Sequence, residues 1–216
     1  MPSEEPRTRI KQIGLEVEGG WRSQPPDLHH DGSVRGLPAD MVVGELSSSP
    51  ITGLANAEAW LRERYPHATN ESCGFHVHLS FNELNYSRLM DEDFNNFFLA
   101  EMERFWLENR SKPGFDLFRF RLDGQNQYCQ KIFRPELQLW RQEAYGDRGT
   151  HPRYSQLNFC YGRHGTMECR LFPCFSDVAD SVEALRVFHN CCETYLQRCQ
   201  PEKPITHVIT ARKAYV

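Results

Sequence analysis

The 216-residue sequence lacks the short motifs that mark several large enzyme classes. It contains no G-x-x-x-x-G-K-[ST] phosphate loop, no G-x-G-x-x-G turn, no H-E-x-x-H helix and no G-x-S-x-G elbow. These absences exclude a P-loop nucleotide site, a Rossmann-type dinucleotide site, a zinc protease of the H-E-x-x-H type and an α/β-hydrolase. If the protein handles a nucleotide, metal ions and arginines must hold the phosphates.

Long hydrophobic runs and an excess of positive charge are also absent. No segment is long and apolar enough to cross a bilayer, and residues 1–6 lack the basic-then-apolar pattern of a signal peptide. We therefore expect a cytoplasmic chain that contacts no membrane. The formal net charge of −4 provides no basic face for a phosphate backbone, so no nucleic-acid partner is expected.

The eight cysteines are irregularly spaced and form no C-x-x-C pair, which argues against a structural zinc site. Without an export signal, a disulfide framework is not expected. We therefore interpret these cysteines as reduced thiols that act as small buried hydrophobic residues.

The length suits one domain with a substantial core, and 14 Phe, 8 Tyr and 4 Trp compensate for a hydrophobic fraction of only 39%. No internal repeat or low-complexity segment occurs. Residues 1–7 are polar and contain two prolines, so we expect a flexible leader there and a single catalytic domain over residues 8–216.

Hydrophobic periodicity predicts a mixture of strands and helices. We expect strands over residues 8–18, 41–47, 74–81, 117–122, 154–161 and 166–172, with Arg119 and Arg121 on one face of the fourth, and a loop over residues 25–38. We expect helices over residues 55–65, from Asp91 as N-cap to about Trp106, and over residues 181–199, with a partly helical covering somewhere in 123–149. The second of these helices would bury a stripe of apolar residues at helical spacing: Phe94, Phe97, Phe98, Met102, Phe105 and Trp106. Glu183 would complete a capping box with Asp180, and His189 would belong to the buried stripe of the last helix. This order predicts an α+β fold with a largely antiparallel sheet.

Ionisable side chains recur at a spacing of two on the predicted strands, so the members of each pair share one face of the sheet. The pairs are Glu16 and Glu18, His76 and His78, and Glu168 and Arg170, with Glu45 on a strand of its own. Carboxylates crowded on one face repel each other unless a cation lies between them. Oxygen ligands with one imidazole favour Mg²⁺ or Mn²⁺.

A simpler interpretation remains open for each pair. Glu16, Glu18 and Glu168 could lie on a solvated strand face and pair with Arg170. His76 and His78 could be hydrogen-bonded core histidines. Arg153, Arg163 and Arg170, in and just before the last hairpin, could bind phosphate oxygens.

The motifs together resemble a known family. The segment 70–80 (NESCGFHVHLS) resembles the H-x-H-x-S segment of glutamine synthetase, residues 167–170 (MECR) its E-x-R strand, and residues 16–18 (EVE) its E-x-E strand. With 31–33 (DGS) and 45–50 (ELSSSP) between them, and 153–158 (RYSQLN) near the end, the order is similar to that of the compact amidoligases. These are ATP-dependent carboxylate–amine ligases.

The resemblance implies a curved, largely antiparallel sheet backed by helices, a glutamine-synthetase-like catalytic fold. It also implies an amide or isopeptide bond formed through an acyl phosphate, with Mg²⁺ (or Mn²⁺) and ATP as cofactors. Small-molecule or peptide carboxylates and amines would be the substrates. The chain lacks a separate N-terminal domain of the glutamine synthetase kind, so the oligomeric state is left open.

The resemblance also implies residue roles. Glu16, His76 and Glu168 would hold the metal at the ATP phosphates, and Glu18 and Glu45 a second metal, although the division between Glu16 and Glu18 is open. Arg153 and Arg170 would stabilise the transferring phosphoryl group. His78 and Ser80 would face the nucleotide, and Asn158 a substrate. Asp31 and Ser33 would contact or deprotonate the amine, or simply form an Asx turn.

Two alternatives have different chemistry. One is a zinc-dependent hydrolase that uses His76, His78 and carboxylates to activate a water molecule. The other is a non-catalytic binding protein that keeps the same sheet without turnover.

Overall fold

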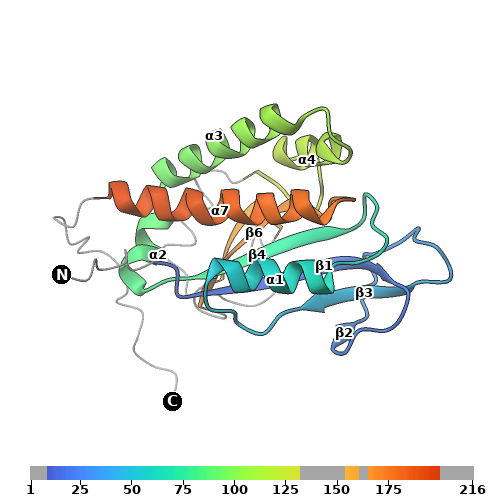
Figure 1. Cartoon of the computed structure of the whole chain (residues 1–216). Helices are drawn as coiled ribbons and strands as arrows, with labels where there is room; N and C mark the ends of the chain where they lie inside the picture. Colours follow the sequence, from blue (N-terminus) through green and yellow to red (C-terminus); the bar gives the residue numbers. More distant parts are fainter. Residues whose placement is uncertain (1–8, 132–153, 161–164, 200–216) are drawn as a thin grey trace, which may run out of the picture.

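The computed structural model of the chain describes residues 9–131, 154–160 and 165–199. These residues form an α+β fold with a six-stranded antiparallel sheet and five helices (Figure 1). Several predictions lie outside the described residues: the leader over 1–7, most of the covering predicted within 123–149, and the positions of Arg153 and Arg163. No helix of the described part is long and apolar enough to span a membrane.

The strands form one sheet in the order β2-β3-β1-β4-β6-β5, and every neighbouring pair is antiparallel. Their bounds are Gln12–Trp21 (β1), Leu28–His29 (β2), Val42–Ser47 (β3), Gly74–Ser80 (β4), Leu157–Cys160 (β5) and Thr166–Pro173 (β6). The antiparallel arrangement is confirmed. The two-residue strand β2 lies in a segment that the sequence predicts as a loop.

The helices pack together on one face of this sheet (Figure 1). Their bounds are Leu54–Arg64 (α1), Glu83–Leu89 (α2), Glu92–Asn109 (α3), Phe115–Leu122 (α4) and Val178–Arg198 (α7). Helix α7 contacts β4 and β6 and is itself flanked by α1 and α3. The core between the layers is rich in phenylalanine, for example Phe98 against Phe188 with ring centroids 5.8 Å apart. One face of the sheet is thereby covered, and the other is left for polar side chains.

The predicted aromatic helix is confirmed as α3. Asp91 is its N-cap, and its carboxylate accepts a hydrogen bond from the Asp93 amide at 3.2 Å. Of the predicted stripe, Phe94, Phe98, Met102 and Phe105 are buried, whereas Phe97 and Trp106 are only partly buried against the core. The helical period of apolar residues thus indicates the buried face correctly.

The strand predicted over residues 117–122 is wrong, because this segment belongs to helix α4. Phe115, Phe118 and Leu122 recur at helical spacing and are all buried. On a helix Arg119 and Arg121 point in different directions. Arg119 pairs at the surface with Glu103 and Asp123, and Arg121 is buried.

Three boundary details also differ from the prediction. Strand β1 continues through Gly19 and Gly20, because a side chain on Gly19 would come within 2.5 Å of Pro66 and the glycine permits this close approach. Helix α7 begins at Val178 with Asp177 as its N-cap, so the capping box predicted at Asp180 is wrong. The side chain buried in that part of α7 is Phe188, and His189 is partly exposed.

All eight cysteines are free thiols. Seven of them are buried, and Cys199 is partly exposed. Burial raises the pKa of the Cys169, Cys174 and Cys192 thiols well above its usual value. Their interpretation as small buried hydrophobic residues is therefore confirmed.

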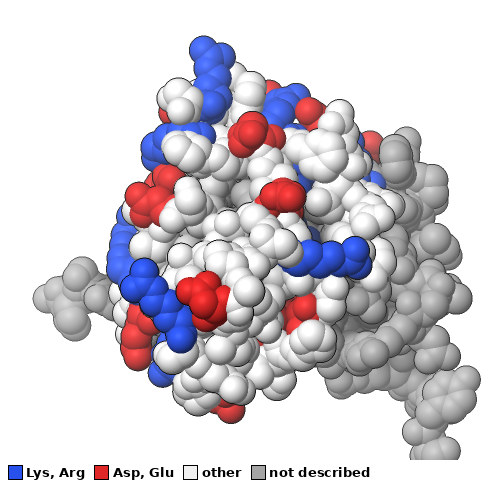
Figure 2. All heavy atoms as spheres, turned by 90° about the vertical axis from the view of Figure 1, so that its right-hand side faces the viewer, with Lys and Arg blue, Asp and Glu red and all other residues white. Residues whose placement is uncertain are grey.

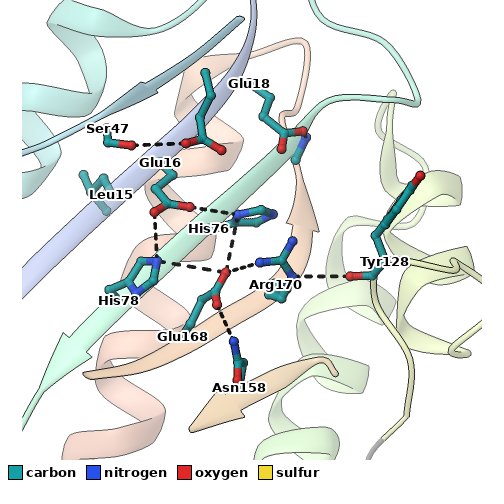
Figure 3. Close-up of polar contacts among 12 residues, drawn as sticks. Leu15, Glu16, Glu18, Ser47, His76, His78, Tyr128, Asn158, Glu168 and Arg170 are labelled. Atoms are coloured by element: carbon teal, nitrogen blue, oxygen red, sulfur yellow. Dashed lines mark hydrogen bonds and ion pairs between the residues drawn. The ribbon is translucent and has the colours of Figure 1, made fainter. Parts of the chain in front are cut away.

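Strand β6 contains a β-bulge at the centre of the sheet. Phe75 lies opposite Phe172 and Val77 lies opposite Cys169, so two residues of β6 stand against His76 alone. Bulges redirect side chains relative to a regular ladder. Cys169 and Phe172 are therefore both buried, while Glu168 and Arg170 lie together on the open face (Figure 3).

Figure 2 shows the end of the molecule that lies on the right in Figure 1. Acidic and basic side chains are interspersed over its described surface, and neither sign forms a continuous patch there. This face therefore presents no strong field of one sign.

Candidate active site

The paired side chains on β1, β3, β4 and β6 converge on the open face of the sheet (Figure 3). The strand register explains the convergence, because residues directly opposite each other in neighbouring strands share a face. The opposed pairs are Glu18 and Glu45, Glu16 and His76, and His78 and Glu168. The structure thus brings together carboxylates and imidazoles from segments far apart in the sequence.

The centre of the site is a contact among two carboxylates and two imidazoles. His76 Nδ1 lies 3.1 Å from Glu16 Oε2 and 3.5 Å from Glu168 Oε1. His78 Nε2 lies 3.3 Å from Glu16 Oε1 and 4.0 Å from Glu168 Oε1. Each imidazole therefore faces both carboxylates, as required of groups that share one ion.

Glu168 is the most strongly held carboxylate of this cluster, and only 3% of its surface is exposed. Its Oε2 accepts a hydrogen bond from Asn158 Nδ2 at 2.8 Å, and its Oε1 pairs with Arg170 Nη1. Burial raises the pKa of Glu168, but the charge of Arg170 and the two imidazoles outweigh burial, so the net shift is downward. Glu168 is therefore ionised at neutral pH.

Glu16 and His78 stabilise each other's charge. Burial raises the pKa of Glu16, but the contacts with His76 and His78 lower it further, to well below its usual range. Burial lowers the pKa of His78, but the carboxylates of Glu16 and Glu168 raise it, with a net upward shift. The Nδ1 atom of His78 contacts Thr166 Oγ1 at 3.3 Å. Its Nε2 is buried and makes no hydrogen bond among the described residues. The contact with Glu16 Oε1 at 3.3 Å is an ion pair that lacks hydrogen-bond geometry.

Glu18 depends on a glycine for its position. Its Oε2 accepts a hydrogen bond from the Gly74 amide at 2.5 Å. A Cβ atom on Gly74 would lie 2.8 Å from His76 Nε2 and 3.2 Å from Glu18 Oε2. Because real Cβ atoms essentially never approach another atom within 3.0 Å, only glycine lets His76 and Glu18 lie this close.

Three groups of side chains could each hold a metal ion. They are Glu16 with Glu45 and His76, Glu16 with His78 and Glu168, and Glu18 with Asp31 and Glu45. In each group one ligand atom per residue lies within 4.8 Å of the others. Ligands on opposite sides of one Mg²⁺ lie about 4 Å apart, so small side-chain adjustments suffice. Asp31 groups with carboxylates here, a placement that sequence reasoning missed because the loop conformation decides it.

Glu45 is a carboxyl group that holds its proton more tightly than usual. Burial, followed by the charge of Glu16, raises its pKa to about 7. A carboxyl must lose its proton to bind a metal. At pH 6 Glu45 is mostly protonated in the metal-free protein, and above pH 8 it is ionised. Metal binding through Glu45 must therefore release a proton at pH 6 and none above pH 8.

We expect Glu45→Gln to lower the number of protons released on Mg²⁺ or Mn²⁺ binding at pH 6 by about one, because this substitution removes the titrating group. Calorimetry at pH 6 in buffers of different ionisation enthalpy measures this number. His78, with its raised pKa, would also release a proton on ligation, so the comparison of variant with parent isolates Glu45. Equal proton release from both proteins would contradict the role of Glu45.

The remaining residues proposed from the sequence lie around this cluster. Asp31 Oδ1 accepts a hydrogen bond from the Ser33 amide at 2.7 Å, so an Asx turn is present. Ser80 lies at the end of β4, where its hydroxyl contacts the Gln12 carbonyl at 3.4 Å. Arg153 lies outside the described residues.

A cavity of about 880 Å³ opens beside the cluster. Its lining comes from the sheet, the loop after β2, the turn before β4, the end of α4 with the segment after it, and the residues before β5: Glu16, Glu18, Asp31, Gly32, Ser33, Arg35, Glu45, Glu71, Ser72, Gly74, His76, Phe120, Arg121, Gln125, Asn126, Gln127, Tyr128, Tyr154 and Arg170. Ligand sites of small-molecule enzymes have volumes of roughly 300–1,000 Å³. The cavity therefore has room for a substrate next to the candidate metal ligands.

Arg121 is a residue of this site that the sequence pattern concealed. Its guanidinium is buried and donates to the Phe172 and Cys73 carbonyls at 3.2 Å each and to the Arg170 carbonyl at 3.4 Å. It thereby connects α4 to the bulge of β6 and to the residue before Gly74. The strand predicted here placed Arg119 and Arg121 on one face. The burial of Arg121 could have been predicted only from the helical spacing of Phe115 and Phe118.

We expect Arg121→Met to destabilise the protein by about 3 kcal/mol, because three backbone carbonyls lose a charged donor. Arg119→Met, two residues away, should cost about 1 kcal/mol or less, since exposed ion pairs contribute little. Urea unfolding followed by circular dichroism measures both. A cost for Arg121→Met no larger than that of Arg119→Met would show that the buried guanidinium does not hold the bulge.

Comparison with known proteins identifies a family for this chain. The sequence model of one protein family, described as "Putative amidoligase enzyme", matches residues 38–189. The match includes strands β3 to β6 and begins after Glu16 and Glu18. No curated protein and no solved structure matches the chain. Because the family match spans more than half of the sequence and includes His76 and Glu168, this chain belongs to the amidoligase enzyme family.

Proposed function

We propose that this protein is an ATP-dependent carboxylate–amine ligase that forms an amide or isopeptide bond through an acyl phosphate. The observation that carries the proposal is the convergence of Glu16, His76, His78, Glu168 and Arg170 beside a large cavity. Family membership supports a ligase. Oxygen-rich ligands beside an arginine suit the neutralisation of phosphate charge.

The residues of the site fit Mg²⁺ or Mn²⁺. The buried His78 Nε2 makes no hydrogen bond among the described residues, and after losing its proton it would offer a lone pair to a metal. The low pKa values of Glu16 and Glu168 keep both carboxylates ready to bind a cation. Glu16, Glu168 and an imidazole would hold one ion, and Glu18, Glu45 and Asp31 a second. Such ions, when bound, neutralise phosphate charge and orient the phosphate oxygens.

Arg170 would stabilise the charge that develops on the transferred phosphoryl group. Its guanidinium is fixed by Glu168 on one side and by the Tyr128 carbonyl, 3.4 Å from Nε, on the other. A pre-oriented arginine loses little conformational freedom when it binds phosphate. The spacing of two along β6 puts Arg170 on the same face as Glu168, so one strand supplies a candidate metal ligand and a phosphate ligand together.

The reaction then has two steps. A carboxylate oxygen of the substrate attacks the γ-phosphorus of ATP, and ADP leaves with the electrons of the broken P–O bond. The amine attacks the carbonyl carbon of the acyl phosphate, inorganic phosphate leaves, and the amine nitrogen loses a proton. Asp31 lines the cavity, and the carboxylate oxygen that it does not offer to the second ion would accept this proton. Aligning the reactants would be the main contribution of the cavity walls.

The nucleotide would approach from the side of His78 and Ser80. Neither residue lines the cavity, although both lie on β4 with His76, which does. The cavity would therefore receive the acceptor, while ATP would bind beside His78 and Ser80.

Calorimetry with Mg²⁺ and a non-hydrolysable ATP analogue tests the proposal directly, and phosphate release from ATP with pooled carboxylates and amines tests turnover. We expect magnesium-dependent nucleotide binding and acceptor-stimulated phosphate release. Tightly bound zinc without nucleotide affinity would identify a hydrolase instead. A protein that binds neither metal nor nucleotide would be a non-catalytic binding protein.

A further inference from the structure

The cavity is lined by candidate metal ligands together with Arg170. Its other lining residues come from the loop after β2, from the turn before β4, and from the end of α4 and the segment after it. If the nucleotide lies on the side of His78 and Ser80, this cavity is the space left for the acceptor.

The wall formed by the end of α4 and the segment after it contains two exposed aromatic side chains among the amides of Gln125, Asn126 and Gln127. Phe120 and Tyr128 are each 41% exposed, and both line the cavity. Among the described residues only one other large hydrophobic side chain is exposed, Leu107, and it does not line the cavity. A single exposed hydrophobic residue is ordinary. Two of the three exposed large hydrophobic side chains of the described residues line this one cavity, next to candidate catalytic groups. We therefore interpret Phe120 and Tyr128 as part of a binding surface.

This aromatic wall is fixed to the reactive end of the site. The Tyr128 carbonyl accepts from Arg170 Nε, and the Tyr128 amide donates to Asn126 Oδ1 at 2.8 Å. The Tyr128 ring packs edge-on against Tyr154, with centroids 5.4 Å apart. Arg170 in turn lies over the Tyr154 ring at 5.8 Å. A ligand that contacts Tyr128 is thereby placed at a set distance from Arg170.

The wall formed by the two loops is polar and carries both charges. Arg35 and Glu71 line it together with Asp31. The loops are joined by Asn70 Nδ2, which donates to the Arg35 carbonyl at 2.6 Å, and by the Arg35 amide, which donates to Ser72 Oγ at 3.0 Å. A ligand between the walls therefore meets two aromatic rings among side-chain amides on one side and mixed charge on the other. Peptides combine these features, with apolar side chains and polar or charged backbone ends.

We propose that Phe120 and Tyr128 form an acceptor subsite that binds an apolar side chain of a short peptide, whose reacting carboxylate or amine lies at the Arg170 end. The proposal rests on the proposed ligase function and narrows its substrate class. The volume of about 880 Å³ supports a peptide-sized acceptor, because a free amino acid would leave most of the cavity unfilled.

The test compares two pools of tripeptides, one with a central Phe or Leu and one with a central Gly, binding to the full chain with Mg²⁺ and a non-hydrolysable ATP analogue. We expect the apolar pool to bind the parent about tenfold more tightly, the usual effect of one well-placed apolar group. Phe120→Ala and Tyr128→Ala should lose most of this preference. Leu107→Ala, the matched exposed hydrophobic residue outside the cavity, should keep it.

Nucleotide affinity, measured first in each protein, separates the two proposals. If the parent and all variants bind the ATP analogue equally but the parent shows no preference between the pools, the subsite is wrong and the ligase function stands. The subsite is equally wrong if Leu107→Ala loses the preference as fully as Phe120→Ala. If the parent binds no nucleotide, both proposals fall.

Discussion

Replacing Glu168 by glutamine should lower magnesium-dependent ATP turnover by about 100-fold or more while leaving the fold intact. The substitution removes the negative charge that faces Arg170, His76 and His78 but keeps the size of the side chain. The Asn158 amide can turn to accept from the new amide group, so the neighbouring strand pairing survives. Phosphate release from ATP measures the loss, and circular dichroism checks the fold.

Glu193→Gln is the matched control for this prediction. Glu193 is also a well-held carboxylate, since it accepts from the amides of Arg9 and Ile10 at 2.7 and 3.0 Å, but it lies on α7 outside the site. It should cost stability without a specific loss of turnover. Full metal-dependent activity in Glu168→Gln would show that this carboxylate holds no catalytic metal.

Gly74→Ala should weaken Mg²⁺ or Mn²⁺ binding by roughly 10- to 100-fold, the range seen when the groups that orient metal ligands are disturbed. The added methyl group would lie 2.8 Å from His76 Nε2 and 3.2 Å from Glu18 Oε2, so both side chains must move. Each belongs to a different candidate metal group, and we expect both ions to bind less tightly. Calorimetric titration of the metal-free protein measures the change.

Gly32→Ala provides the control, because Gly32 lines the same cavity and an added Cβ atom would meet nothing within 4 Å. It should bind metal like the parent. If Gly74→Ala and Gly32→Ala bind metal equally well, the close approach at Gly74 has no bearing on the ions, and a different set of ligands must be sought.

The sequence predicted the pairs of this site because strand geometry is local. A spacing of two in a strand puts Glu16 with Glu18, or Glu168 with Arg170, on one face whatever the rest of the fold does. The antiparallel class also followed from the order of elements. Sequence reasoning could not place β2, which has two residues and no period of its own.

The rest of the site depends on contacts between distant segments. Asp31 joins Glu18 and Glu45 only because its loop folds back over the sheet. The spacing of Arg119 and Arg121 suggested one face of a strand. The segment is a helix instead, because this conformation buries Phe115 and Phe118 in the core. The bulge at Arg170 leaves no mark in the sequence, because any residue type can occupy it. The local spacing of residues thus indicated the candidate metal ligands. Which ligands share an ion, and which residues hold them in place, could be seen only in the three-dimensional structure.

The bulge also determines which changes of chain length this fold can tolerate. Removing one residue at 171 would restore a regular ladder between β4 and β6, with Arg170 alone opposite His76 and the pairs Phe75–Phe172 and Val77–Cys169 unchanged. The acid at 168 would stay on the open side, and the thiol at 169 would stay in the phenylalanine layer. Loss of the extra residue is therefore compatible with retention of the acid, and its cost would fall on the packing of the leucine at 171.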